Sequence, residues 1–311
     1  MDNLEFVGKC LYLNVGNIRN GSVGKIAEEK EVKGKKNAGG RRLGEKSKGM
    51  LVVGDLHLGY EESLNRSGVL VIRKMFSEMI LYFDSVFDEL KEREKEDGRE
   101  RRIDEIVLLG DVKHGFGKGN KQEWNDVLEL FDYLIKKMNE FSSVGTGLRY
   151  GREKKREKKI IVVRGNHDNY IKNIAGKRNV IVEDFYIVSG IGFCHGDKRI
   201  KEFDKKEIKM IVVGHGHPAV RLIDKKSGKE ESYKCFLVGK WKVSLGGRRF
   251  GIGNVKGIII VPSFIEYSEG TDARENDLGL GWDFELNKFN VKIVSEPDKL
   301  EVLDFGILGK L

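Results

Sequence analysis

All the histidines of this chain lie in short polar segments that follow apolar runs. The chain has 311 residues and only six histidines. Five segments hold all six: Asp55–His57, Gly110–His114, Gly165–Asp168, His195–Asp197 and Gly214–His217. Histidines kept for structural reasons alone would be scattered, so this joint placement indicates one shared site.

The side-chain types in these segments suit a pair of metal ions. Carboxylates, imidazoles and the amide of Asn166 form a mixed donor set, which suits Mn, Fe, Co, Ni or Zn better than Ca or Mg. Two ions about 3.5–4 Å apart can neutralise phosphoryl oxygens and generate a hydroxide at neutral pH, as phosphoester hydrolysis requires. A ligand shared by two ions has to serve both at once, and a carboxylate such as Asp111 can do so.

Apolar runs before the segments predict buried strands whose ends meet at the site. Leu51–Val53, Ile103–Leu109 and Ile160–Val163 are such runs, and a glycine follows each within two residues. Asp55 and His57, two residues apart, would share one face of an extended segment. Because ligands of open α/β sheets bind beyond the carboxyl ends of strands, we expect the polar segments to converge there.

Two amphipathic helices and a β-rich second half are predicted around these strands. Apolar residues recur at helical spacing over 72–90 and 124–138, and Asn120 with Glu123 would cap the second helix. The charged run Lys91–Arg102 is expected to be an exposed turn. Further short strands are predicted at 10–13, 180–188, 191–194, 208–213, 220–223, 233–238 and 257–261.

The expected fold class is α+β or α/β, with two mixed β-sheets packed face to face and flanked by helices, a four-layer αββα sandwich. We expect a single domain over 1–311, with a basic Gly/Lys-rich insertion at 14–48 and a mostly β part at 219–311. The insertion lacks periodicity, which favours an exposed loop, and it would be either solvated or in contact with nucleic acid.

Composition restricts the class of protein. The net charge is +8, from 57 Lys and Arg against 49 Asp and Glu, which favours polyanionic partners or a well-solvated surface rich in Lys and Glu. Cys10, Cys194 and Cys235 have no metal-site spacing, which indicates a reduced, intracellular setting. The sequence shows no signal peptide and no apolar run of about 18 residues, so we expect a cytoplasmic protein without membrane contact. Its oligomeric state is not indicated.

The order of the segments resembles a known superfamily. D-x-H, GD, GNHD, a lone His and GH-x-H occur in this order in the calcineurin-like metallophosphoesterases, and the resemblance covers about Val52 to Pro218. DLHLGY, GDVKHGFG and GHGHPA are most similar to the archaeal branch of the ICC-like phosphoesterases. A bacterial relative of that branch is described as a ligase-associated DNA-damage-response endonuclease.

The resemblance implies two divalent metal ions, foremost Mn, with Fe, Ni, Co or Zn as alternatives. Asp111 would bridge the two ions. The ligands of the first ion would be Asp55, His57 and His217, and those of the second Asn166, His195 and His215.

The resemblance also implies three residues that act without binding metal. His167 would donate a proton to the leaving oxygen as the general acid. Asp168 would orient the loop that carries His167. His114 would orient His167 or contact the substrate, unless it is only a solvated turn residue.

We therefore expect a phosphodiesterase or nuclease that hydrolyses nucleic acid with a metal-bridging hydroxide. Net charge and the GD-x-x-H pattern favour this substrate, while the GD-x-x-D-R-G of the phosphatase subgroup is absent. One alternative is a phosphodiesterase or phosphatase that acts on nucleotides or other small phosphoesters. Another is a metal-bound, non-catalytic protein-interaction module, for which loss of a ligand or of the general acid would be expected, yet every position is filled.

Overall fold

A computed structural model gives the fold and describes residues 4–15, 48–143, 157–223, 226–242, 255–295 and 300–311. The first sheet has six strands in sequence order: β1 (Leu4–Val7), β2 (Cys10–Val15), β3 (Lys48–Val53), β4 (Glu105–Leu108), β5 (Lys159–Val163) and β6 (Ile181–Glu183). β1, β2 and β3 pair antiparallel, whereas β3 to β6 pair in parallel. The carboxyl ends of β3, β4 and β5 therefore meet at one edge.

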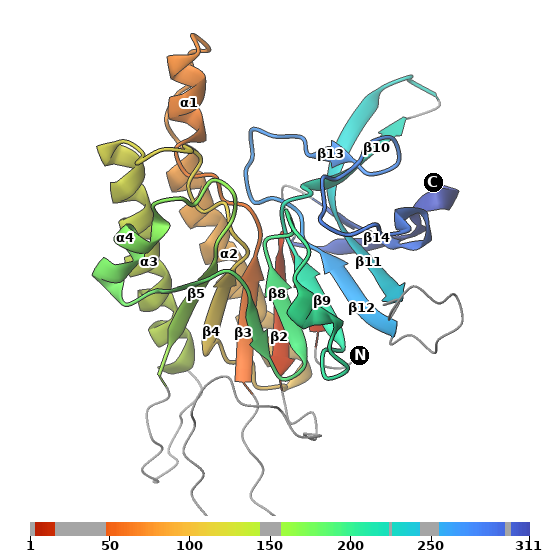
Figure 1. The fold of residues 1–311 in the computed structure, drawn as a ribbon, viewed down its shortest axis with the longest axis horizontal. Helices are drawn as coiled ribbons and strands as arrows, with labels where there is room; N and C mark the ends of the chain where they lie inside the picture. Colours follow the sequence, from red (N-terminus) through yellow and green to blue (C-terminus); the bar gives the residue numbers. More distant parts are fainter. Residues whose placement is uncertain (1–3, 16–47, 144–156, 224–225, 243–254, 296–299) are drawn as a thin grey trace, which may run out of the picture.

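Three α-helices of the described residues, α2 (Met75–Asp97), α3 (Lys121–Ser143) and α4 (Ile171–Ala175), pack on the outer face of this sheet, and α1 (Tyr60–Arg66) projects beyond the strand ends (Figure 1). The 3₁₀ turn η1 (Gly176–Arg178) follows α4. Leu51 and Val53 of β3 join the helix-side core, while Met50 and Val52 face the second sheet. Successive side chains of β3 point to opposite faces of the sheet, so this apolar strand contributes to both hydrophobic cores.

The second sheet is mixed and has nine strands. Seven form the order β13 (Thr271–Asp272), β10 (Pro218–Ile223), β11 (Glu230–Lys242), β12 (Val255–Ile260), β9 (Met210–Val213), β8 (Ile191–Cys194) and β7 (Tyr186–Val188). β14 (Asn290–Val294) pairs with β11 and with β15 (Val302–Ile307). β8, β9 and β12 run in parallel, so the ends of β8 and β9 also share an edge.

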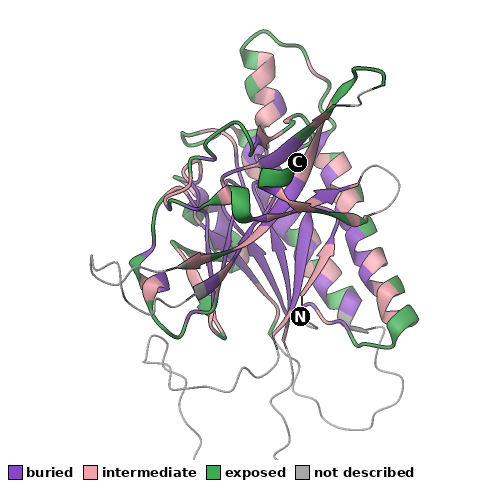
Figure 2. Ribbon diagram, turned by 90° about the vertical axis from the view of Figure 1, so that its right-hand side faces the viewer, coloured by how far each residue is buried: buried purple, intermediate pink, exposed green. Residues whose placement is uncertain are grey.

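The two sheets pack face to face, as predicted. Between them the rings of Phe6 and Phe236 lie 4.8 Å apart, and the strands are the most buried part of the molecule (Figure 2). The far side of the second sheet is covered by η2 (Lys201–Asp204), by η3 (Leu286–Lys288) and by the loop 273–285 just before η3. This loop carries Trp282 and Phe284. The fourth layer thus consists of 3₁₀ turns and loops in the described residues, with η4 (Leu308–Lys310) at the end of the chain.

The charged run at 91–102 was predicted to be an exposed turn, but most of it is helical. α2 continues through it to Asp97 and ends where Gly98 adopts a left-handed φ of 67°. Ion pairs along the helix, Glu89 with Arg93 at 2.7 Å and Glu92 with Lys95 at 2.7 Å, stabilise this polar extension. The prediction was wrong because apolar periodicity ends several residues before the helix does.

The other predicted helix and most of the predicted strands are present with shifted ends. The single strand predicted over 180–188 is wrong: the structure has two strands there, β6 in the first sheet and β7 in the second. The Asn120 side chain accepts the N–H of Glu123 at 2.7 Å, so Asn120 caps α3 as predicted. The Glu123 carboxylate does not complete the cap, because it accepts the N–H of Gly115 instead. Residues 16–47 of the predicted insertion lie outside the described residues, and its ends belong to β2 and β3. In the described ranges, none of the helices has the length and apolar character needed to cross a bilayer.

Candidate metal centre

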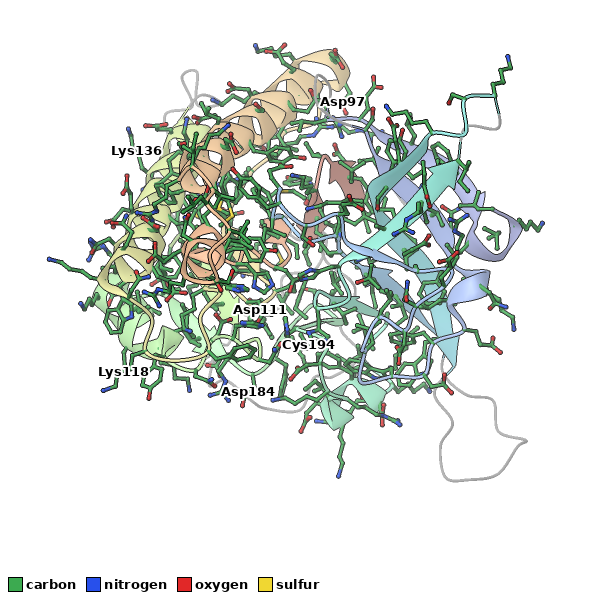
Figure 3. The ribbon with its side chains drawn as sticks, turned by 90° about the horizontal axis from the view of Figure 1, so that it is seen from above. Asp97, Asp111, Lys118, Lys136, Asp184 and Cys194 are labelled. Carbon is green, nitrogen blue, oxygen red and sulfur yellow. The ribbon has the colours of Figure 1, made fainter. Side chains whose placement is uncertain are left out.

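The seven predicted metal ligands lie in loops at the edge where strands of both sheets end. Three loops come from the first sheet and two from the second, so the site joins the two halves of the sandwich. Seen from above, Asp111 and Cys194, the residue before His195, lie near the middle of the molecule (Figure 3). The ligands are Asp55 and His57 after β3, Asp111 after β4, Asn166 after β5, His195 after β8, and His215 and His217 after β9.

Asp55, His57 and His217 form a first group that could hold an ion. One donor atom from each lies within 4.8 Å of the others. Nε2 of His217 is 3.6 Å from Oδ1 of Asp55 and 3.3 Å from Nε2 of His57. These donors come from β3 and β9, hence from both sheets.

Asp111, His195 and His215 form a second group of the same kind. Nε2 of His195 lies 3.4 Å from Oδ2 of Asp111, 2.9 Å from Nδ1 of His215 and 2.9 Å from Oδ1 of Asn166. Nδ1 of His195 contacts the carbonyl of Leu109 at 2.8 Å, which fixes the ring and leaves Nε2 turned toward the other donors.

Asp111 connects the two groups. Its Oδ2 atom is 3.6 Å from Nε2 of His57 in the first group and 3.4 Å from Nε2 of His195 in the second. A carboxylate in this place can contact two ions at once. The donor set of carboxylates, imidazoles and an amide therefore fits a pair of divalent metal ions.

The electrostatics of the pocket also favour cations. Asp55 is fully buried and Asp111 nearly so. Burial alone would raise the pKa of Asp111, but its hydrogen bond with His195 outweighs this effect and holds the pKa below the ordinary value. Burial would likewise raise the pKa of Asp55, and His217 lowers it. Two buried negative charges need positive partners, which metal ions can provide.

The imidazoles have protonation states that suit metal ligation. Burial lowers the pKa of His57 to about 3, so its ring is neutral at pH 7 and offers a lone pair. Burial lowers the pKa of His215 in the same way, and so does the neighbouring His195. Burial would lower the pKa of His195 too, but the hydrogen bond to Asp111 raises it to about 9. A bound metal ion would displace the proton of His195.

The ligand loops hold their residues in a strained backbone conformation. Seven non-glycine residues among those described have positive φ, and five of them are predicted metal ligands. They are Asp55 (27°), His57 (47°), Asp111 (48°), His215 (64°) and His217 (43°). Side chains with a Cβ rarely adopt this conformation, and such strain is concentrated at functional sites.

Two glycines allow the loops after β4 and β5 to approach each other. A Cβ on Gly110 would lie 2.7 Å from both the amide nitrogen of Gly165 and Nδ1 of His195. A Cβ on Gly165 would lie 2.2 Å from Oδ1 of Asp111. Larger residues at either position would force Asp111 and His195 apart.

His167 lies beside the second group with a fixed ring. Its backbone N–H donates to Oδ1 of Asp111 at 2.9 Å, and its Nδ1 contacts the carbonyl oxygen of His114. A carbonyl only accepts, so Nδ1 carries a proton. Nε2 then faces the site, 4.0 Å from Oδ2 of Asp111.

His114 contacts both His167 and a predicted ligand. Its Nδ1 is 3.2 Å from Nδ1 of His57, and its ring stacks on His167 with centroids 5.3 Å apart. One donor atom from each of His57, His114 and His167 also lies within 4.8 Å of the others, although the prediction placed only His57 among the metal ligands.

Asp168 connects two ligand loops from a fully buried position. Its Oδ1 accepts the N–H of Val112 at 3.1 Å, and its Oδ2 accepts the N–H of Gly165 at 3.0 Å. Burial raises the pKa of Asp168 to about 6, although the hydrogen bond from Gly165 opposes this rise. The carboxylate thus holds the loops of Asp111 and Asn166 together.

Phe116 was not among the predicted site residues. Its ring stacks on His167 with centroids 3.8 Å apart, yet 60% of the residue is exposed. The Phe116 carbonyl accepts from Nδ2 of Asn169 at 2.9 Å, which ties this loop to the loop of His167. An aromatic residue within a glycine-rich loop, shortly after a ligand, was the available signal in the sequence.

The chain is similar to solved structures only at low identity and low TM-score. The nuclease MPE of Pseudomonas putida is 13% identical with a TM-score of 0.44, over 78% of this chain and 84% of that one. A single mutant of Vps29 from Entamoeba histolytica is 12% identical with a TM-score of 0.30, over 83% of this chain and 99% of that one. No curated protein sequence matches the chain.

The sequence profile described as calcineurin-like phosphoesterase matches residues 50–218. This range is more than half of the chain and runs from β3 to the first residue of β10. It contains every residue of the two metal groups, together with His114, His167 and Asp168. The chain therefore belongs to the calcineurin-like phosphoesterase family and is a metal-dependent phosphoester hydrolase.

Proposed function

We propose that this enzyme is a phosphodiesterase that cleaves nucleic acid, with two divalent ions, foremost Mn²⁺, at the site. The observation that carries the two-ion part is the position of Asp111 Oδ2, within 3.6 Å of one nitrogen from each donor group. The nucleic-acid part is supported by the net charge of +8 and by an exposed aromatic ring, Phe116, beside the proposed general acid.

The residues divide the chemistry between them. When bound, the ions neutralise phosphoryl oxygens and supply a hydroxide at neutral pH. His167 is the proposed general acid: its Nδ1–H donates to the His114 carbonyl, which leaves Nε2 to carry the proton that goes to the leaving oxygen. His114 contacts the rings of both His57 and His167 and so holds them in place.

An assay of three substrates tests this proposal. Purified enzyme with Mn²⁺ should hydrolyse bis-p-nitrophenyl phosphate and single-stranded DNA, and should leave mononucleotides largely intact. An Asp111→Asn variant, purified in parallel, controls for contaminating nucleases. Cleavage of mononucleotides in preference to DNA would favour the small-phosphoester alternative. Metal binding without hydrolysis of any ester would favour the interaction module. Most of the basic segment 149–159 and most of 14–48 lie outside the described residues.

Asp168→Asn should weaken metal binding although it removes no ligand. The amide would turn an N–H₂ toward Val112 or Gly165 and leave a buried donor without an acceptor. Groups that support ligands in this way typically contribute about 10–100-fold to metal affinity. Competition with a chelator of known affinity measures the change.

The control for this experiment is Asp88→Asn, an exposed carboxylate on α2 whose side chain is 73% accessible. It should leave metal affinity unchanged. Equal affinities for the two variants, with both folded by circular dichroism, would show that Asp168 does not support the site.

A further inference from the structure

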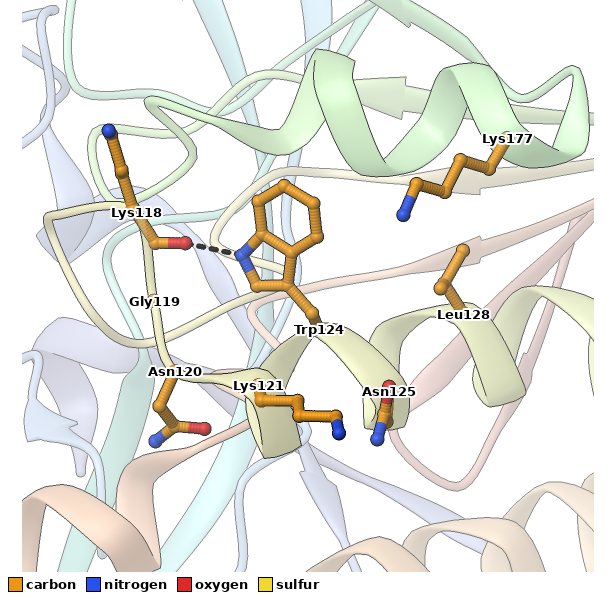
Figure 4. A pocket seen from close by; sticks show the side chains of 8 residues that line it. All are labelled: Lys118, Gly119, Asn120, Lys121, Trp124, Asn125, Leu128 and Lys177. Carbon is orange, nitrogen blue, oxygen red and sulfur yellow. Dashed lines mark hydrogen bonds between the residues drawn. The ribbon is translucent and has the colours of Figure 1, made fainter.

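A separate pocket of about 390 Å³ lies where the loop after Asp111 enters α3. It contains none of the metal-site residues. Its lining combines an indole ring with three lysines and has no carboxylate (Figure 4). The side chains that matter are Lys118, Lys121, Trp124, Asn125 and Lys177.

Trp124 is held in place with its ring open to the pocket. Its Nε1–H donates to the carbonyl of Lys118, so the polar edge of the indole is satisfied (Figure 4). The ammonium of Lys177 lies 5.2 Å from the ring centroid. Lys118, Lys121 and Lys177 are exposed and form no ion pair with any described residue, so their charges remain available to a ligand.

The pocket adjoins the metal centre through one rigid loop. Phe116, stacked on His167, is two residues before Lys118, and two residues span at most about 7 Å between Cα atoms. The buried Lys113 donates to the Gly117 carbonyl at 3.2 Å, and Glu123 accepts the Gly115 N–H at 2.8 Å. These bonds fix the loop between the two aromatic rings.

We propose that this pocket binds a nucleotide of a single-stranded substrate, next to the phosphodiester at the metal centre. The base stacks on Trp124, and the strand's phosphates contact Lys118, Lys121 and Lys177. Stacking on indole requires a base that is free of a duplex, and lysines that form no ion pair with a described residue favour a polyanion. This inference rests on the proposed nucleic-acid function and assigns the strand a path from Phe116 to Trp124.

Binding of a fluorescein-labelled twelve-nucleotide oligo(dT) to the metal-free enzyme tests the pocket without hydrolysis. The double variant Lys118→Glu/Lys177→Glu should weaken binding at least tenfold. The plot of log K against log salt has a negative slope, and the variant should make this slope less steep by about 1.4. The reason is that each phosphate contact with a single strand contributes about 0.7 to its magnitude. Lys95→Glu/Lys136→Glu is the control with the same change in net charge. Lys136 lies on the same helix as Trp124, roughly 18 Å along it, and Lys95 is an exposed residue near the end of α2; Figure 3 shows Lys136 and Asp97, two residues after Lys95, far from Lys118.

Two substitutions of Trp124 separate stacking from structure. Trp124→Leu keeps an apolar side chain in the helix and should weaken oligo(dT) binding about tenfold, within the range typical of one stacked base. Trp124→Phe keeps a ring and should bind almost as well as wild type. Quenching of tryptophan emission by oligo(dT) should be seen in the wild type and lost in Trp124→Phe.

Three outcomes would overturn the inference. The first is equal binding by the Lys118→Glu/Lys177→Glu variant and by its Lys95→Glu/Lys136→Glu control. The second is equal affinity for duplex and single-stranded DNA. The third is displacement of oligo(dT) by poly-glutamate at matched charge. Hydrolysis of bis-p-nitrophenyl phosphate by the wild type is measured separately. If the diester is cleaved but the pocket variants bind normally, this inference alone fails. If no diester is cleaved, the proposed function fails, whatever the pocket binds.

Discussion

Replacing His167 by asparagine should slow hydrolysis of esters with poor leaving groups by about 10²–10⁴-fold, with both metal ions still bound. Nε2 of His167 faces Asp111 from 4.0 Å, and the His114 carbonyl fixes the opposite nitrogen. The backbone N–H, which donates to Asp111 Oδ1, is kept in the variant. The loss should therefore come from the missing proton and not from a disturbed ligand. Single-turnover rates with alkyl and p-nitrophenyl esters, together with metal analysis, measure it.

The leaving group supplies the internal control. p-Nitrophenolate departs readily without a proton, so His167→Asn should cost much less with that ester than with an alkyl ester. A variant that slows all esters equally, or that has lost an ion, would show that His167 acts as a ligand or a structural residue.

Replacing Asp111 by asparagine should weaken both metal sites and abolish measurable hydrolysis. The Oδ2 atom of Asp111 faces donors of both groups. The asparagine amide would be uncharged and would have only one oxygen, so it could not serve two ions as a carboxylate can. His57→Ala removes a donor of the first group only and should reduce mainly one site. Elemental analysis and calorimetric titration with Mn²⁺ should give two ions for wild type, about one for His57→Ala, and fewer than one for Asp111→Asn.

A single ion in the wild type at saturating metal would contradict this arrangement. So would full occupancy of one site in Asp111→Asn, because the carboxylate would then serve only one ion. Circular dichroism of each variant is needed beside these measurements, since Asp111 is buried between two packed loops.

That the predicted ligands lie close together could be expected from the sequence because each follows a strand. An apolar run such as Leu51–Val53 forms a buried strand, and parallel neighbours bring their carboxyl ends to one edge. The same reasoning placed His195 and His215, whose strands β8 and β9 are also parallel neighbours. At these positions the apolar run in the sequence and the parallel arrangement of the strands both indicate the same place, the edge of the sheet, so the position can be predicted.

Other features depend on contacts that no local pattern reveals. β14 and β15 are short, and β14 pairs with β11 more than 50 residues earlier in the chain. The left-handed backbone of Asp111 and His215 is uncommon for any residue with a Cβ, and packing of the loops imposes it. The pocket at Trp124 needs Lys177 from the segment after α4, which sequence spacing does not bring to α3.

Each donor group draws side chains from both sheets, so a bound ion acts as a cross-link across the sandwich. Asp55 of the first sheet faces His217 of the second, and Asp111 faces His195. Any opening of the sheets would break these pairs, and ligands that bind only the closed form stabilise it by mass action. At a free metal concentration 100 times Kd, one site adds about 2.7 kcal/mol to the free energy of unfolding. The lifetime of the folded enzyme in the cell would therefore follow the supply of metal, and a chelator would expose the chain to proteases as well as stop its chemistry.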